Sequence, residues 1–224
     1  IALVVGADGA PLSKRTGSKS VEELRSAGYL PSAINNYLAR LGHTYDANAF
    51  MSLEVLAEHF DLSRLGRAPA RYDEAQLMHW QREALLQLPA AALREWMGDD
   101  VRALVPADSL DGFIEAVRGN IVFPADALRW ARIVFTDRLV VSHAAREAMT
   151  VAGPEFFAIA RQALEKHGAD FKAVAETVKQ ARSVSGKALF QPLRAALTGE
   201  LDGPEMARLL PLIGMEHARK RLSI

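Results

Sequence analysis

Apolar residues recur along most of the chain three and four positions apart, which is the period of an amphipathic α-helix. Within residues 31–42 the apolar positions that share one face are Ile34, Tyr37, Leu38 and Leu41. The same spacing, with Pro, Gly and capping residues as boundaries, predicts helices at 20–28, 31–42, 53–59, 73–88, 93–97, 124–135, 143–149, 154–167, 171–182, 187–197, 204–213 and 215–222. An all-α body is therefore predicted.

The first ten residues depart from this pattern. Residues 1–5 form a short apolar run rich in β-branched side chains, and Gly6-Ala7-Asp8-Gly9 follows it. An apolar run that ends in glycine-rich turn residues is typical of a strand. We expect a small β remnant at the N-terminal end of a helical chain.

Local signals also mark helix ends and softer boundaries. Ser20 and Glu23 have the spacing of a capping box, and Gly28 stands where a helix C-terminal glycine belongs. Soft boundaries are indicated near Gly98-Asp99-Asp100 and near Ala152-Gly153. These positions are candidate boundaries between domains or subdomains.

Composition removes several classes of protein. The chain has 224 residues, no cysteine, and 27 basic against 27 acidic side chains. The absence of cysteine excludes disulfides, a cysteine nucleophile and cysteine-based metal sites. No signal peptide or membrane-length apolar run is visible, so a cytoplasmic location without membrane association is expected. The chain begins with Ile1, which predicts a fragment.

Two local basic clusters stand out against the zero net charge. One is the polar loop of residues 11–18, which contains Ser13, Lys14 and Arg15. Fixed cations beside a hydroxyl can hold a phosphate chain, although a solvated basic loop is the alternative. The other is residues 177–199, which hold four cations and no carboxylate. That window suits an RNA surface or, alternatively, a solvated helix face.

A set of ordered motifs resembles bacterial glutamyl-tRNA synthetase, a class I aminoacyl-tRNA synthetase, from its KMSKS-type signature loop onward. The motifs are Leu12-Ser13-Lys14-Arg15, Gly28-Tyr29-Leu30-Pro31, Asn36-Tyr37-Leu38-Ala39-Arg40-Leu41-Gly42, Phe60-Asp61-Leu62, Pro69-Ala70-Arg71-Tyr72-Asp73 and Gln191-Pro192-Leu193-Arg194-Ala195-Ala196-Leu197-Thr198-Gly199. The signature loop departs from the family pattern at one position, where Pro11 replaces the first signature lysine. Lys14, the other signature lysine, is intact.

The resemblance implies a ligase that activates glutamate with ATP and Mg²⁺ and then transfers it to tRNA. It assigns Ser13, Lys14 and Arg15 to ATP, with Lys14 as the catalytic residue. The nucleotide-binding half with its His-x-Gly-His-type signature has no counterpart in this sequence. We therefore expect the chain to bind tRNA without catalysing the reaction and to hold no bound cofactor.

The resemblance also implies a division of the chain. Residues 1–20 would end the catalytic domain with the signature loop, residues 21–97 would form a helical stem-contact region, and residues 98–224 would form an α-helical anticodon-binding domain, with a subdomain break near residue 152. A helical second half differs from the β-barrels of glutaminyl-tRNA synthetase.

Anticodon contacts are implied at four positions near the end of the chain: Arg194, Gly203, Pro204 and Met206. Gly203 and Met206 differ conservatively from the family pattern. Arg118 is the candidate for reading the first anticodon base, with a surface arginine at a helix end as the alternative. The expected partner is tRNA(Glu), and whether tRNA(Gln) is also accepted stays open; a monomer is expected.

Other candidate sites are weaker. His143 and Glu147 are four residues apart and could share a metal, but no third ligand is suggested, so no metal site is predicted. The three tryptophans are predicted core anchors: Trp80, Trp96 and Trp130. The competing hypothesis for the whole chain is a helical protein-interaction module with no role in RNA binding.

Overall fold

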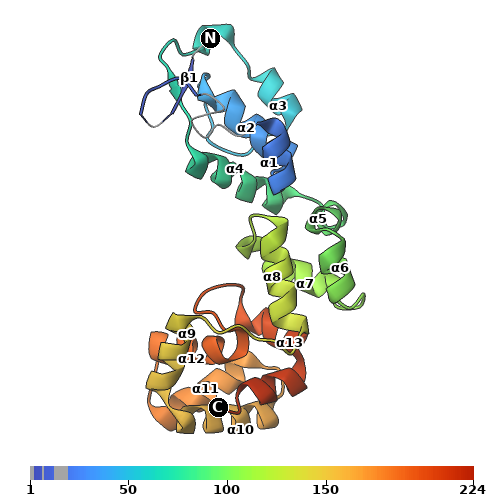
Figure 1. Cartoon of the computed structure of the whole chain (residues 1–224), viewed down its shortest axis with the longest axis vertical. Coiled ribbons are helices and arrows are strands. Elements are labelled where there is room, and N and C mark those ends of the chain that lie inside the picture. Colours follow the sequence, from blue (N-terminus) through green and yellow to red (C-terminus); the bar gives the residue numbers. More distant parts are fainter. Residues whose placement is uncertain (1–2, 7, 13–19) are drawn as a thin grey trace. The chain divides into compact units, whose positions relative to one another are not determined.

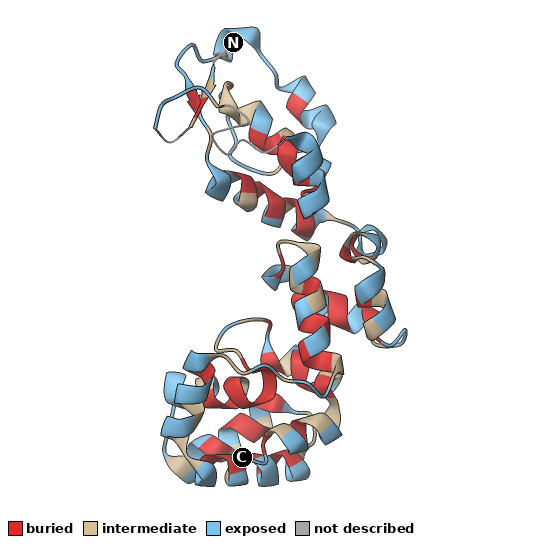
Figure 2. Ribbon diagram, viewed as in Figure 1, coloured by how far each residue is buried: buried red, intermediate tan, exposed pale blue. Residues whose placement is uncertain are grey.

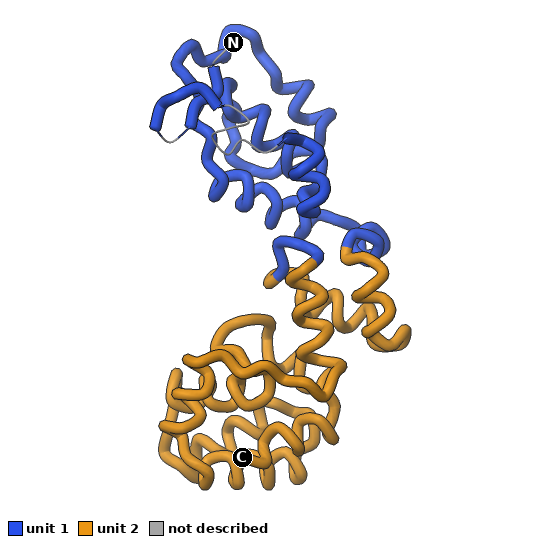
Figure 3. The backbone as a smooth tube through the Cα atoms, viewed as in Figure 1, with its two compact units in different colours: residues 1–96, 121–124 blue, residues 97–120, 125–224 orange. Residues whose placement is uncertain are grey.

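The chain folds into two compact units. The computed structural model describes residues 3–6, 8–12 and 20–224. Unit 1 comprises residues 1–96 and 121–124, and unit 2 comprises residues 97–120 and 125–224 (Figure 3).

Unit 1 combines short helices with one small parallel sheet (Figure 1). Its elements are β1 (Val4–Val5), α1 (Val21–Ala27), α2 (Pro31–Leu41), α3 (Leu53–Glu58), the 3-10 helix η2 (Leu62–Arg64), β2 (Ala70–Arg71), α4 (Glu74–Gln87) and α5 (Ala90–Met97), which ends at the unit boundary. The predicted N-terminal strand is confirmed at Val4–Val5. Its partner β2 was not predicted from the sequence, and the two pair with Val4 opposite Ala70 and Val5 opposite Arg71.

A buried glutamine joins three segments of unit 1. The side chain of Gln81 on α4 accepts a hydrogen bond from Leu30 N at 2.9 Å and donates to Gly28 O and Val122 O, both at 3.1 Å. Gln81 is 0% exposed, and all of these bonds satisfy its buried side-chain amide. One side chain thus fixes the start of α2 and residues 121–124 against α4.

Unit 2 is helical throughout (Figure 1). Its elements are α6 (Asp99–Leu104), α7 (Leu110–Val117), the 3-10 helix η3 (Arg118–Asn120), α8 (Pro124–Phe135), α9 (His143–Ala152), α10 (Pro154–His167), α11 (Phe171–Arg182), α12 (Lys187–Thr198) and α13 (Met206–Arg221). Buried positions lie on the inward helix faces and exposed ones on the outside (Figure 2). The largest of these buried side chains include Trp130, Phe113, Phe156, Phe157 and Leu164.

Most of the predicted elements are confirmed. Among the described residues the helices dominate and the only sheet has two two-residue strands, so the all-α prediction is confirmed. The capping box is present, because Glu23 N donates to Ser20 Oγ at 3.2 Å and Ser20 N donates to Glu23 Oε2 at 2.6 Å. α8, α10 and α11 have the predicted bounds.

Three local features differ from the sequence prediction. α6 and α7 were not predicted, although Leu110 and Phe113 have helical spacing. The predicted helix from residue 204 begins two residues later, at Met206, and the two expected helices follow one another directly, with a break in the helical path at Gly214 (φ 77°). Trp96, a predicted core anchor, is only partly buried, and its indole N–H donates to Gly28 O at 2.8 Å.

No helix in the described ranges is long and apolar enough to cross a bilayer.

Candidate nucleic-acid interface

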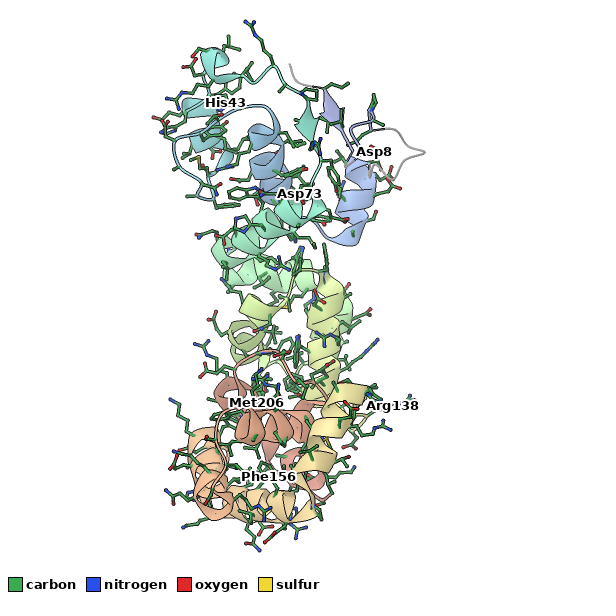
Figure 4. All side chains as sticks on the ribbon, turned by 90° about the vertical axis from the view of Figure 1, so that its left-hand side faces the viewer. Asp8, His43, Asp73, Arg138, Phe156 and Met206 are labelled. Atoms are coloured by element: carbon green, nitrogen blue, oxygen red, sulfur yellow. The ribbon has the colours of Figure 1, made fainter. Side chains whose placement is uncertain are left out.

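Three of the residues that the resemblance assigns to the anticodon lie together in unit 2. Arg194 projects from α12, and its Nη1 donates a hydrogen bond to the carbonyl oxygen of Pro204 at 2.8 Å. Met206 begins α13 two residues later and is labelled in Figure 4. Pro204 and Met206 are buried, whereas Arg194 is partly exposed. The arginine is therefore the polar member of this group that a ligand can reach.

The turn after α12 brings Pro204 to Arg194. α12 ends at Thr198, and the next residue, Gly199, adopts a left-handed conformation that lets the chain reverse. Thr198 Oγ1 donates to Arg194 O at 2.8 Å and accepts from Glu200 N at 3.2 Å, so the side chain ties the last turn of the helix to the loop. Residues 200–205 then return along α12.

Arg194 and Met206 line a hollow of about 290 Å³. Its walls come from the start of α11, from α12 and from the start of α13, and its lining residues are Phe171, Lys172, Phe190, Arg194, Glu205, Met206 and Ala207. Sequence analysis did not identify Phe190, Phe171 or Lys172 as part of this site. The available signal was the spacing of Phe190 and Arg194, four residues apart on one helix face.

The electrostatics of the hollow centre on Arg194. Burial lowers the pKa of its guanidinium, while the carboxylate of Asp202 acts in the opposite direction. Because arginine titrates far above neutral pH, the group remains charged. A guanidinium carries five N–H donors, and the bond to Pro204 takes one of them. Arg194 therefore combines a fixed orientation with spare donor capacity.

Gly203 is explained by packing. Its φ of 144° disfavours an L side chain, and a Cβ at this position would overlap the indole ring of Trp130. Any role of Gly203 toward a ligand therefore falls to its backbone.

Arg118 lies apart from this group. It follows α7 in η3, and its Nη2 is 4.0 Å from Glu115 Oε1. Its side chain is mostly buried and does not line the hollow beside Arg194.

The basic window of residues 177–199 is partly neutralised on the protein itself. Lys179 Nζ lies 3.0 Å from Glu176 Oε2, and Arg182 pairs with Glu155. Hydrogen bonds from Lys179 and Gln180 lower the pKa of Glu176. Exposed ion pairs of this kind contribute at most about 1 kcal/mol, so a polyanion can displace them.

The predicted ATP residues Ser13, Lys14 and Arg15 lie outside the described residues. The structure describes the segment just before them. Leu12 N donates to Val4 O at 3.3 Å, and Pro11 forms a bridge with Val5. Pro11, the departure from the signature, is therefore anchored beside β1.

The structure also shows the surroundings of His143, the weaker metal candidate, and of the buried His43. His143 Nδ1 is 3.7 Å from Glu147 Oε1 on the exposed face of α9, and the described residues contain no group of three or more potential metal ligands. His43 is buried, accepts a hydrogen bond from Asp61 N at 3.0 Å and stacks on Phe60.

Comparisons with known proteins match the whole chain. Residues 75–224 match the anticodon binding domain family, and residues 1–79 match the catalytic domain family of class I tRNA synthetases for E and Q. The chain is 54% identical over 222 residues to glutamate–tRNA ligase 2 of Nitrosococcus oceani, covering 99% of this chain and 47% of that protein. It is 48% identical over 220 residues to glutamate–tRNA ligase 1 of Halorhodospira halophila, covering 98% and 46%.

The fold also has a counterpart among solved structures. A glutamate tRNA ligase from Elizabethkingia meningosepticum matches with a TM-score of 0.79 at 21% identity, covering 98% of this chain and 49% of that one. The chain spans about half the length of the relatives that it matches. By these matches the chain belongs to the glutamyl-tRNA synthetase family, over a region that runs from the class I catalytic domain through the anticodon-binding domain.

Proposed function

We propose that this chain is the tRNA-binding portion of a glutamate–tRNA ligase, with the anticodon loop bound on unit 2. The observation that carries the proposal is the 2.8 Å bond from Arg194 to Pro204, which joins two of the implied anticodon residues beside Met206. A half-buried, oriented guanidinium is suited to hydrogen-bond or stack on a base that is splayed out of a loop. Gly203 and Pro204 contribute backbone groups, and Arg118 is proposed to reach the first anticodon base.

The proposed parent reaction is activation of glutamate by ATP, with Mg²⁺, followed by transfer of glutamate to the 3′ end of tRNA(Glu). Ser13, Lys14 and Arg15 are proposed to bind the phosphates of ATP, and Lys14 to stabilise the charge that develops during adenylate formation. The proposed division is 1–20, 21–97 and 98–224, with a subdomain break near residue 152. The chain on its own is proposed to bind tRNA(Glu) as a cytoplasmic monomer without catalysing either step.

The test measures binding of tRNA(Glu) to the full 224-residue chain at two salt concentrations. The comparison set contains an anticodon-altered transcript, Arg194→Ala, Arg194→Lys and, as a matched control, Arg161→Ala on the exposed surface of α10. Several phosphate contacts make the affinity fall steeply with salt. Loss of Arg194 is expected to weaken binding by about 1–3 kcal/mol and to remove discrimination against the altered anticodon.

The variants separate charge from geometry. Arg194→Lys keeps the charge but lacks the planar fork, so it is expected to resemble the alanine variant. Arg161→Ala is expected to bind normally apart from a small loss of general electrostatic attraction. Binding that ignores both the anticodon and Arg194 would refute anticodon reading at this site. Absence of binding would favour the protein-interaction module. The affinity for tRNA(Gln), compared with that for tRNA(Glu), shows whether the chain accepts both tRNAs.

A further inference from the structure

We propose that Phe190 is a stacking platform for an unpaired base of the bound RNA, next to the Arg194 site. The inference rests on the proposed function and extends it to a residue that neither the motifs nor the resemblance assigns. Phe190 is 48% exposed on α12, an unusual position for a large aromatic side chain in a unit whose other large rings are mostly buried.

The surroundings of Phe190 hold its ring in place. The centroid of Phe171, a buried residue at the start of α11, lies 6.4 Å from the centroid of Phe190, with the planes tilted by 38°. Both rings line the 290 Å³ hollow, together with Lys172. A ring that is supported from one side and open on the other presents an apolar face to a ligand at little cost in side-chain entropy.

The charges around the hollow favour a nucleobase over an isolated phosphate. Lys172 and Arg194 supply cations that attract an RNA backbone, but Glu205 lines the same hollow, with its Oε2 3.6 Å from Arg208 Nε. A phosphate inside the hollow would meet that carboxylate. An uncharged base avoids this repulsion, stacks on Phe190 and can donate an N–H to Glu205 while its phosphates face the cations.

A hydrophobic partner protein fits this hollow less well. The aromatic surface is small and is bordered by Lys172, Arg194 and Glu205 within one cavity. Stacking of bases on aromatic rings between cations is the general solution for single-stranded nucleic acid. The geometry therefore points to one unstacked base as the occupant.

The experiment uses anticodon stem–loop RNAs of tRNA(Glu) that carry 2-aminopurine at one loop position at a time, with the full 224-residue chain. Stacking on an aromatic ring quenches this fluorophore, so the scan identifies the base that meets Phe190. With Phe190→Leu, we expect about 10-fold weaker binding and a loss of quenching at that single position. Phe190→Trp is expected to preserve both properties.

Phe60→Leu is the matched control, since Phe60 is also 48% exposed but belongs to unit 1. It is expected to leave the quenching profile unchanged. If the wild-type chain binds the RNA and Phe190→Leu changes neither affinity nor any quenching position, the stacking inference is wrong while the proposed function stands. If the wild-type chain does not bind these stem–loops at all, both the inference and the proposed anticodon binding fail.

Discussion

The two units achieve their folds by different means. Unit 2 contains more than twice as many buried apolar residues as the described part of unit 1. Three of the four buried polar residues among the described positions belong to unit 1 instead: Asn36, His43 and Gln81. Each of them hydrogen-bonds backbone groups of a segment distant in sequence. Unit 2 is thus organised by its apolar helix faces. Unit 1 depends instead on the hydrogen bonds by which these three buried polar side chains join short elements, here called its polar joints.

The difference has a consequence for the residues that we propose to bind RNA. Arg194 and Met206 in unit 2 are held by long helices whose inward faces form one core, so the proposed anticodon site sits on a rigid base. In unit 1, Asn36 Oδ1 accepts from Met51 N at 3.0 Å, and its Nδ2 donates to Met51 O at 2.8 Å. This one amide therefore fixes the end of the loop between α2 and α3 at Met51.

The largest effect is expected from a cavity in the core of unit 2. Phe157 is 0% exposed on α10, and Phe157→Ala should lower the free energy of unfolding by about 4 kcal/mol. Urea unfolding measures the loss, and hydrogen exchange locates it in peptides of unit 2. Val151→Ala, at a largely exposed valine on α9, is the control and should change little. A loss below about 1 kcal/mol would contradict the view that apolar packing organises this unit.

The next effect comes from the polar joint of unit 1. Gln81→Leu keeps the volume of the side chain but removes the acceptor of Leu30 N and one donor each from Gly28 O and Val122 O, although Gly28 O keeps the indole N–H of Trp96. We therefore expect the free energy of unfolding to fall by about 3 kcal/mol. Amide hydrogen exchange should become faster in the unit 1 peptides around residues 28–30 and 121–124. Gln76→Leu on the exposed face of the same helix is the matched control. Wild-type stability in Gln81→Leu would show that the joint is dispensable and would remove the contrast between the units.

A smaller effect is expected at Gly203, where packing and backbone conformation coincide. Gly203→Ala forces Trp130 to move and places a Cβ at φ 144°, which should cost about 2 kcal/mol and shift the emission of Trp130. Gly153→Ala also has a positive φ, but open space surrounds its Cβ, so it isolates the backbone strain. Equal losses in the two variants would mean that contact with Trp130 contributes nothing.

The same contrast explains how far the sequence predicts the molecule. Helix periodicity and caps predict α8, α10 and α11 to the residue, because the residues that begin and end each helix lie at its own ends in the sequence. The pairing of β1 with β2 was not predicted, since two residues carry no period and the partner lies 66 positions away. The joint at Gln81 was missed for the same reason, because nothing in a polar residue on a helix indicates three distant backbone partners.

The candidate site shows the same limit at the level of side chains. Motif resemblance assigned Arg194 and Met206, and the structure places them around one hollow. Lys172 was not assigned, because it joins the site only through the packing of α11 against α12. Phe190 was not assigned either, although it lies four residues before Arg194 on the same helix. Arg118 was assigned by proximity to a shortened motif, and the described contacts do not bring it to the hollow.

The smallest effect concerns a buried phenol in unit 1. Burial raises the pKa of Tyr37 above its ordinary value of 10.0, with further increases from Tyr72 and Asp73, although the hydrogen bond from Asp73 N opposes the shift. Because the folded state binds the phenol proton more tightly, this contribution to stability is complete below pH 10 and is lost as the pH rises through the folded pKa. At pH 7, Tyr37→Phe should cost about 1 kcal/mol, since Asp73 N loses its 2.8 Å acceptor. Urea unfolding from pH 7 to pH 11 should show the gap between the variant and the wild type closing above pH 10, because only the wild type has a phenol to ionise at this position. If the difference in stability between the two proteins stays constant over this range, Tyr37 has the same pKa in the folded and the unfolded chain. Its phenol would then be open to water, against the view that unit 1 depends on buried polar contacts.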